Sequence, residues 1–143
     1  MPLEGSRAGR ALLAKLKTYI KDYAASMEAW DFISEALQGQ ALQNCFAWQA
    51  TGESGAPVTM AILTTDRGLF EFAFTGATHQ YQLTRLSDIC SVREARHNDN
   101  GPTIELRICQ SDGQRDRTYC IRGKEETQEL REFLHGLRQQ LQK

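Results

Sequence analysis

The stretch from Val58 to Val92 decides the fold. It begins V-T-M-A-I-L-T-T-D-R-G-L-F-E-F-A-F-T (58–75) and ends Q-Y-Q-L-T-R-L-S-D-I-C-S-V (80–92). Apolar residues alternate on both sides of the turn at Thr65–Gly68, a pattern typical of two strands with one buried face. Gly68 is expected to take the positive φ that a short hairpin with a bulge needs. A third strand enters through the Leu86–Ile89 corner.

Alternation of this kind continues outward from the stretch, and turn-forming residues separate the segments. Short links favour antiparallel pairing. Seven strands are predicted: Leu42–Ala50, Val58–Thr65, Leu69–Thr75, Gln80–Leu83, Ile89–Ala95, Thr103–Cys109 and Arg117–Arg122. The expected core consists of large apolar side chains from these strands and a final helix: Phe46, Trp48, Met60, Ile62, Phe70, Phe72, Ile89, Val92, Leu106, Ile108, Tyr119, Ile121, Leu130, Phe133 and Leu137.

Helical spacing of apolar residues flanks the strands. From Arg7 the pattern runs to Gly39, a glycine placed as a helix terminator, and predicts one long helix or two shorter ones. In the second case Ser26 is the expected N-cap. A second apolar stripe, from Leu130 to Leu141, predicts a C-terminal helix with acidic residues near its start and basic residues near its end.

Composition restricts the class of protein. The chain has 143 residues, of which 41% are hydrophobic and 24% charged, which is enough for one ordinary globular core. Its net charge of −1 argues against a nucleic-acid-binding domain, which usually carries a basic excess. Lys15 and Lys17 interrupt the apolar cluster near the start, so we expect no secretion signal, no membrane span and a cytoplasmic location.

The residues give no enzymatic pattern. The four cysteines, Cys45, Cys90, Cys109 and Cys120, form no C-x-x-C pair and are expected to be small buried thiols, with disulfides as the less favoured alternative. Three scattered histidines lack metal-ligand spacing, and no phosphate-binding loop or nucleophile motif is present. We therefore predict no enzyme, no metal, no cofactor and no small-molecule substrate.

Two motifs inside the central stretch resemble a known family. Thr64-Thr65-Asp66-Arg67-Gly68-Leu69-Phe70 is similar to the T-x-x-R hairpin, and Leu86-Ser87-Asp88-Ile89-Cys90-Ser91-Val92 to the L-x-D-I-x-x-V entry, of bacterial pleckstrin-homology-like (PH-like) and GRAM-type domains. The resemblance covers about 42–141 and includes the final helix. It implies an α+β, mainly β fold: a PH-like, partly open barrel of seven antiparallel strands, capped by the C-terminal helix.

The N-terminal helical segment lies outside the resemblance. We therefore expect two parts, a helical segment 1–39 and a PH-like domain 40–143. Phosphoinositide-binding members of the family carry several Lys and Arg residues in the first inter-strand loop. Here the loop Thr51–Pro57 has one charged residue, Glu53, and so departs from that pattern.

Function is therefore sought in the N-terminal segment. The expected contact residues are Arg7, Arg10, Lys15, Lys17, Lys21, Leu12, Leu16 and Tyr19, which lie on one amphipathic helix. The first hypothesis is a non-enzymatic interaction or scaffold module that docks a protein partner or another copy of itself through this helix. The resemblance also implies a homo-oligomer. The alternative is peripheral binding to an anionic membrane surface through the basic residues. A solvated outer face is the other interpretation of these charges.

Size and acidity alone would also suit an α/β dimer of the secretion-chaperone type. The predicted run of consecutive strands argues against it, because such folds alternate helices with strands.

Overall fold

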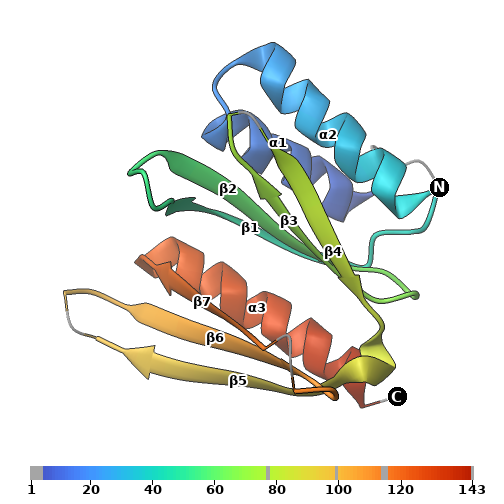
Figure 1. Cartoon of the computed structure of the whole chain (residues 1–143), viewed down its shortest axis with the longest axis vertical. Coiled ribbons are helices and arrows are strands. Elements are labelled where there is room, and N and C mark those ends of the chain that lie inside the picture. Colours follow the sequence, from blue (N-terminus) through green and yellow to red (C-terminus); the bar gives the residue numbers. More distant parts are fainter. Residues whose placement is uncertain (1–4, 77, 99, 114–115, 143) are drawn as a thin grey trace. The chain divides into compact units, whose positions relative to one another are not determined.

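The chain forms two compact α+β units in a computed structural model, which describes residues 5–76, 78–98, 100–113 and 116–142. The units are Met1–Leu83 and Thr84–Lys143. Each combines an antiparallel sheet with helices (Figure 1). The predicted α+β class, with N-terminal helices and a C-terminal helix, is confirmed, and the strands form two antiparallel sheets, of four and three strands, and not a closed barrel.

The N-terminal segment contains two helices, α1 (Arg7–Tyr19) and α2 (Tyr23–Leu37). Ser6 caps α1 by accepting a hydrogen bond from the Gly9 backbone N–H at 2.9 Å. Asp22 caps α2 by accepting from the backbone N–H groups of Ala24 and Ala25. The prediction of Ser26 as the cap was wrong. Ser26 lies within α2, and its hydroxyl donates to the Tyr23 carbonyl. Asp22, four residues earlier, satisfies the first free N–H groups of the helix, so the helix begins before Ser26.

The first unit has a four-stranded meander in the order β1-β2-β3-β4. Its strands have the bounds β1 Asn44–Thr51, β2 Pro57–Thr64, β3 Leu69–Phe74 and β4 His79–Thr84. Ala47 lies opposite Ala61, and Leu63 opposite Phe70, so small and large apolar residues line one face. The turn from β2 to β3 is closed by Thr65, whose hydroxyl accepts from the Arg67 N–H at 3.1 Å. Gly68 is not among the positive-φ residues, so that prediction was wrong.

Both helices pack on this face of the sheet. Leu12 and Leu16 of α1 and Trp30 and Ile33 of α2 share one buried cluster with side chains of β1, β2 and β3. At the edge of the cluster, the Phe32 ring lies 6.1 Å from the Phe72 ring in an edge-to-face arrangement. The N-terminal helices are thus part of the compact unit that contains β1–β3, whereas the predicted division into 1–39 and 40–143 stays a prediction.

The expected core is buried apart from three residues. Met60, Val92 and Tyr119 are half-buried, although the residues opposite them in the sheets, Trp48, Ile108 and Leu106, are buried. The expected core omitted Leu12 and Leu16 of α1, Leu37 of α2 and the strand residues Leu63 and Phe74, all of which are buried.

The second unit is also a meander, in the order β5-β6-β7. Its elements have the bounds η2 Leu86–Asp88, β5 Ile89–His97, β6 Thr103–Gln110, β7 Arg117–Arg122 and α3 Lys124–Leu141. Helix α3 contacts β6, β7 and η2, and its stripe of Leu130, Phe133, Leu134 and Leu137 is buried.

Gly123 starts α3 with a left-handed backbone, at φ 111° and ψ 150°. Its N–H donates to the Pro102 carbonyl at 3.0 Å, and its carbonyl accepts from the Thr127 N–H at 3.0 Å. The Thr127 hydroxyl donates to the same carbonyl at 2.7 Å. One glycine therefore joins the end of β7, the loop before β6 and the first turn of α3.

The cysteines are all free thiols. Cys109 is buried, as expected, but Cys90 and Cys120 are exposed, so the expectation of buried thiols was wrong for these two. The reason is strand phase: Cys120 pairs with Glu105, on the outward face of the second sheet.

An ion-pair cluster joins α3 to β5. Arg138 donates to Glu94 at 2.7 Å, and Arg96 donates to the other Glu94 oxygen at 3.1 Å. Burial raises the pKa of Glu94, but the hydrogen bonds from Arg138 and Arg96 outweigh this effect and hold that pKa below its ordinary value. Folding therefore favours the ionised form of this carboxylate.

We expect Glu94→Gln to lower the free energy of unfolding at neutral pH by about 1 kcal/mol, because both arginines are partly exposed. A group with a depressed folded-state pKa stabilises the fold above its unfolded-state pKa, and this stability is lost as the pH falls through the folded value. The difference between variant and wild type should shrink as the carboxylate protonates. Urea unfolding across a pH series from about 7 to about 3 measures it.

Glu105→Gln is the matched control, since the Glu105 carboxylate is 53% exposed and lies 3.8 Å from His97. The stabilising role of the ionised Glu94 carboxylate would be contradicted in two cases. In the first, Glu94→Gln lowers the free energy of unfolding no more than Glu105→Gln does. In the second, the loss for Glu94→Gln stays the same at acid pH.

Candidate functional site

The predicted basic residues lie on or directly after α1. Arg7, Arg10 and Lys17 are exposed, Lys15 is half-buried, and Lys21 is exposed in the connection to α2. Arg10 donates to the Gly5 carbonyl at 3.0 Å. The Lys15 ammonium lies 5.9 Å from the centre of the Tyr19 ring. The structure therefore presents Arg7, Arg10, Lys17 and Lys21 to solvent, as a contact surface requires.

The predicted apolar contact residues lie elsewhere. Leu12 and Leu16 are 1% and 0% exposed and belong to the buried cluster beneath α1. Tyr19 is half-buried, and its carbonyl accepts from the Gln49 amide at 3.3 Å. These two leucines hold the helix on the sheet and are covered by it, so they are not available to a partner.

Three of the basic residues share the outer face of α1 with one alanine. Arg7, Arg10, Ala14 and Lys17 recur at three- and four-residue steps, within ~80° of the helix circumference. All four are exposed, and α1 contains no acidic residue. We call Arg7, Arg10 and Lys17 the basic stripe. The Lys17 ammonium lies 5.8 Å from the ring of Tyr23, the first residue of α2.

Helix α2 carries the opposite charge on its outer face. Ala24, Glu28, Asp31 and Glu35 are exposed and recur at the same steps, and α2 contains no basic residue. We call Glu28, Asp31 and Glu35 the acidic stripe. Sequence reasoning missed this stripe, although its spacing was visible, because only the apolar positions of the helix were traced. Among the residues that the structure describes, neither stripe forms a salt bridge.

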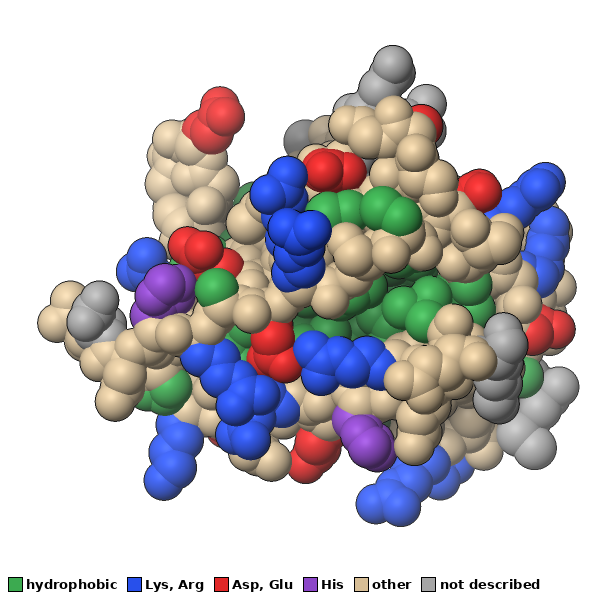
Figure 2. Space-filling model, turned by 90° about the horizontal axis from the view of Figure 1, so that it is seen from below, with side chains coloured by type: hydrophobic (Ala, Val, Ile, Leu, Met, Phe, Trp, Pro, Cys, Tyr) green, Lys and Arg blue, Asp and Glu red, His purple; other side chains and the backbone are tan. Residues whose placement is uncertain are grey.

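Charges of the second unit are arranged differently. Arg96 pairs with Glu94, and Arg107 lies 3.3 Å from Asp116, so cations and carboxylates neutralise each other locally. On the face of the molecule in Figure 2, Lys and Arg side chains are interspersed with Asp and Glu. Helices α1 and α2 differ from this pattern, because each carries charges of one sign, whereas α3 carries both signs.

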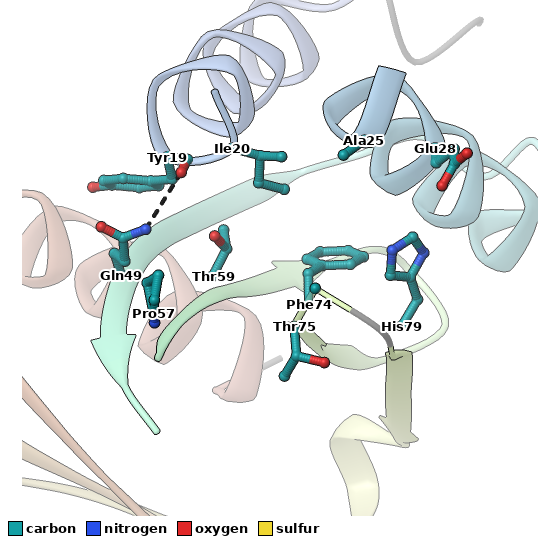
Figure 3. Close-up of a pocket in the computed structure, with 11 residues that line it drawn as sticks. Tyr19, Ile20, Ala25, Glu28, Gln49, Pro57, Thr59, Phe74, Thr75 and His79 are labelled. Atoms are coloured by element: carbon teal, nitrogen blue, oxygen red, sulfur yellow. Dashed lines mark hydrogen bonds between the residues drawn. The ribbon is translucent and has the colours of Figure 1, made fainter. Parts of the chain in front are cut away.

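A pocket of about 190 Å³ opens near the connection between α1 and α2 (Figure 3). Ile20 approaches from the connection between the helices and Ala25 from α2, and Phe74 lies opposite them on β3. The His79 ring packs edge-on against Phe74 at 5.3 Å. The other residues that line the pocket are Tyr19, Glu28, Gln49, Pro57, Thr59, Thr75 and Gly76.

The chemistry of this pocket is limited. Glu28 and His79 are its ionisable groups apart from Tyr19, and neither Cys, Ser, Lys nor Arg lines the part that the structure describes. Glu28 also belongs to the acidic stripe, so the pocket lies at the edge of the charged outer face. This arrangement supplies no nucleophile paired with a base.

The other histidines lie apart from the pocket. His97 faces Glu105 at 3.8 Å, and His135 lies 3.3 Å from the Gln139 amide. Within the described ranges, no cluster of three or more His, Cys, Asp or Glu side chains is placed to bind a metal ion. Nor does any helix in the described part of the chain combine the length and the apolar character needed to cross a bilayer.

Comparison of the chain with protein-family models, with curated proteins and with solved structures found no match.

Proposed function

We propose that this chain is a non-enzymatic protein-interaction module that docks a protein partner through the outer face of its N-terminal helices. The observation that carries the proposal is the basic stripe. Arg7, Arg10 and Lys17 are exposed on a helix without acidic residues, and they are free of salt bridges within the described ranges. Such a stripe attracts carboxylates and gives an interface specificity and fast association.

The scaffold proposed for this surface is a variant PH-like domain. A four-stranded meander, a three-stranded meander and a final helix follow one another in the order that the resemblance implies. The loop at 52–56, between β1 and β2, carries Glu53 as its one charged residue. This loop does not favour binding of a phosphoinositide head group, so the proposed contact surface is the helical one.

Peripheral binding to an anionic membrane is the alternative, and the structure supports it less. Insertion of an amphipathic helix requires apolar side chains at the lipid face, but Leu12 and Leu16 are buried within the unit. The acidic stripe on neighbouring α2 would also be repelled by anionic lipids. A protein surface that bears carboxylates is therefore the favoured partner.

Site-specific photocrosslinking in the native cell tests the proposal. A photoreactive residue at Ala14, which is exposed within the basic stripe, should give a discrete crosslinked protein product. The product should disappear when Arg10→Glu and Lys17→Glu are added, because the stripe then repels carboxylates.

The matched control places the same photoreactive residue at Gln128, which is exposed on α3. No crosslinked product is expected from Gln128 if the partner binds the basic stripe. The same product from Gln128 as from Ala14 would show that the contact is not specific to that stripe. Absence of a product from Ala14, or a product indifferent to the charge reversals, would overturn the proposal.

A further inference from the structure

The helical layer carries both signs of charge, one on each helix. Arg7, Arg10 and Lys17 lie on the outer face of α1, and Glu28, Asp31 and Glu35 on the outer face of α2. The two helices contact each other, run in opposite directions and cover the same sheet (Figure 1). A partner that suits the whole layer needs an acidic strip beside a basic strip, at the spacing of two packed helices. A second copy of this layer has that pattern.

We propose that the outer face of the α1–α2 hairpin binds the same face of a second copy of this chain, with the basic stripe of each copy against the acidic stripe of the other. This inference rests on the proposed function and names its partner. A two-fold axis parallel to the helices places α1 of one copy over α2 of the other. The contact is isologous, so each charged pair occurs twice and the assembly closes as a dimer.

The position of the connection sets the register of the pairs. In an antiparallel hairpin, residues equally far from the central connection residue, Lys21, lie at the same height. Arg7 precedes Lys21 by 14 residues, and Glu35 follows it by 14. Arg10 precedes it by 11, and Asp31 follows it by 10. A two-fold axis parallel to the helices preserves these heights, so Arg7 faces Glu35 and Arg10 faces Asp31 of the other copy.

The third pair is offset. Lys17 precedes Lys21 by 4 residues, whereas Glu28 follows it by 7. The difference of three residues corresponds to ~4.5 Å along a helix, which a flexible lysine side chain spans. Three charged pairs of opposite sign therefore form on each side of the axis, without a like-charge pair among them.

The alanines of the two stripes allow the helices to approach. Ala14 interrupts the basic stripe and Ala24 precedes the acidic stripe, and both are exposed. Small side chains at such positions permit interaxial distances of about 8–10 Å. Since the contact is mainly ionic and solvent-accessible, we expect a weak dimer that salt dissociates.

Analytical ultracentrifugation of the full chain tests the inference. At low salt the mass should approach twice the chain mass of 16.2 kDa, and it should return to that of one chain at about 0.5 M salt. The basic-reversed variant combines Arg7→Glu, Arg10→Glu and Lys17→Glu. The acid-reversed variant combines Glu28→Lys, Asp31→Lys and Glu35→Lys. Each should be a monomer alone, because both of its helices then carry one sign.

An equimolar mixture of the two variants should restore the dimer, because one copy presents only negative stripes and the other only positive ones. The control reverses Lys124 and Arg131, which are exposed on α3, and should dimerise like the wild type. Circular dichroism and thermal melting establish that each variant is folded before its mass is interpreted.

A wild-type chain that stays monomeric at low salt overturns the inference, as does a mixture that fails to associate while the wild type dimerises. A reversed variant that dimerises alone also overturns it. If the chain is monomeric but Ala14 crosslinks to a different protein, the inference falls and the proposed function stands. If a monomer instead sediments with phosphatidylserine vesicles and the basic-reversed variant does not, the occupant is a membrane and both proposals fall.

Discussion

Phe72→Ala is expected to lower the free energy of unfolding by about 3–5 kcal/mol. Phe72 is 1% exposed at the centre of β3. Its ring stacks on Phe74 at 5.9 Å and Phe70 at 6.1 Å, and Phe32 of α2 packs edge-on against it at 6.1 Å. Truncation removes this contact area and leaves a cavity at the point where α2 meets the sheet. The expected loss is a large share of the stability of a domain this size.

Urea unfolding followed by tryptophan fluorescence measures this loss. Both tryptophans of the chain, Trp30 and Trp48, are buried in the first unit, so their emission reports on that unit. Tyr23→Ala is the control, because the Tyr23 ring is 69% exposed and its removal should change stability by less than about 0.5 kcal/mol. A loss below about 1 kcal/mol for Phe72→Ala would show that the aromatic cluster does not hold α2 in place.

Gly123→Ala is expected to destabilise the chain by about 1–3 kcal/mol. At φ 111° and ψ 150° the backbone lies in a region that is essentially restricted to glycine. An added Cβ would also clash with a carboxylate oxygen of Glu126, which must rotate away. If the backbone relaxes instead, the hydrogen bonds of Gly123 to Pro102 and Thr127 are lost together.

Gly76→Ala provides the comparison, because a Cβ at Gly76 meets nothing within 4 Å and its φ is not positive. It should be neutral or slightly stabilising, since alanine has a smaller backbone entropy in the unfolded chain. Chemical denaturation with far-ultraviolet circular dichroism compares the two variants. If the two variants are equally stable, the positive φ of Gly123 and its hydrogen bonds do not contribute to the stability of the fold.

The strands could be predicted from the sequence because their signal is local. Period-two alternation bounded by glycine and polar turns placed all seven within a few residues of their observed bounds. Details that depend on competition between groups were not predictable in this way. Ser26 is a good cap in isolation, but Asp22 starts the helix earlier. Gly68 has the residue type of a positive-φ turn, yet the Thr65 hydroxyl closes the turn without one.

The candidate site was predictable in part. The exposure of Arg7, Arg10 and Lys17 follows from their position opposite the apolar stripe of α1. An apolar stripe does not reveal what covers it, so Leu12 and Leu16 were assigned to a contact surface when they belong to an internal cluster. The acidic stripe suggests a contact surface only when it lies beside the basic stripe. The two stripes are neighbours because the chain breaks at Ile20–Asp22 into two helices instead of forming one long helix.

The meander order of both sheets has a consequence for synthesis of the chain on the ribosome. Each strand pairs with the strand next to it in sequence, so every ladder closes a short loop. Helices α1 and α2, strands β1 to β3 and the buried cluster of the first unit all lie before Thr84. Contacts within that cluster can therefore form while the final 60 residues (143 minus 83) are still being translated.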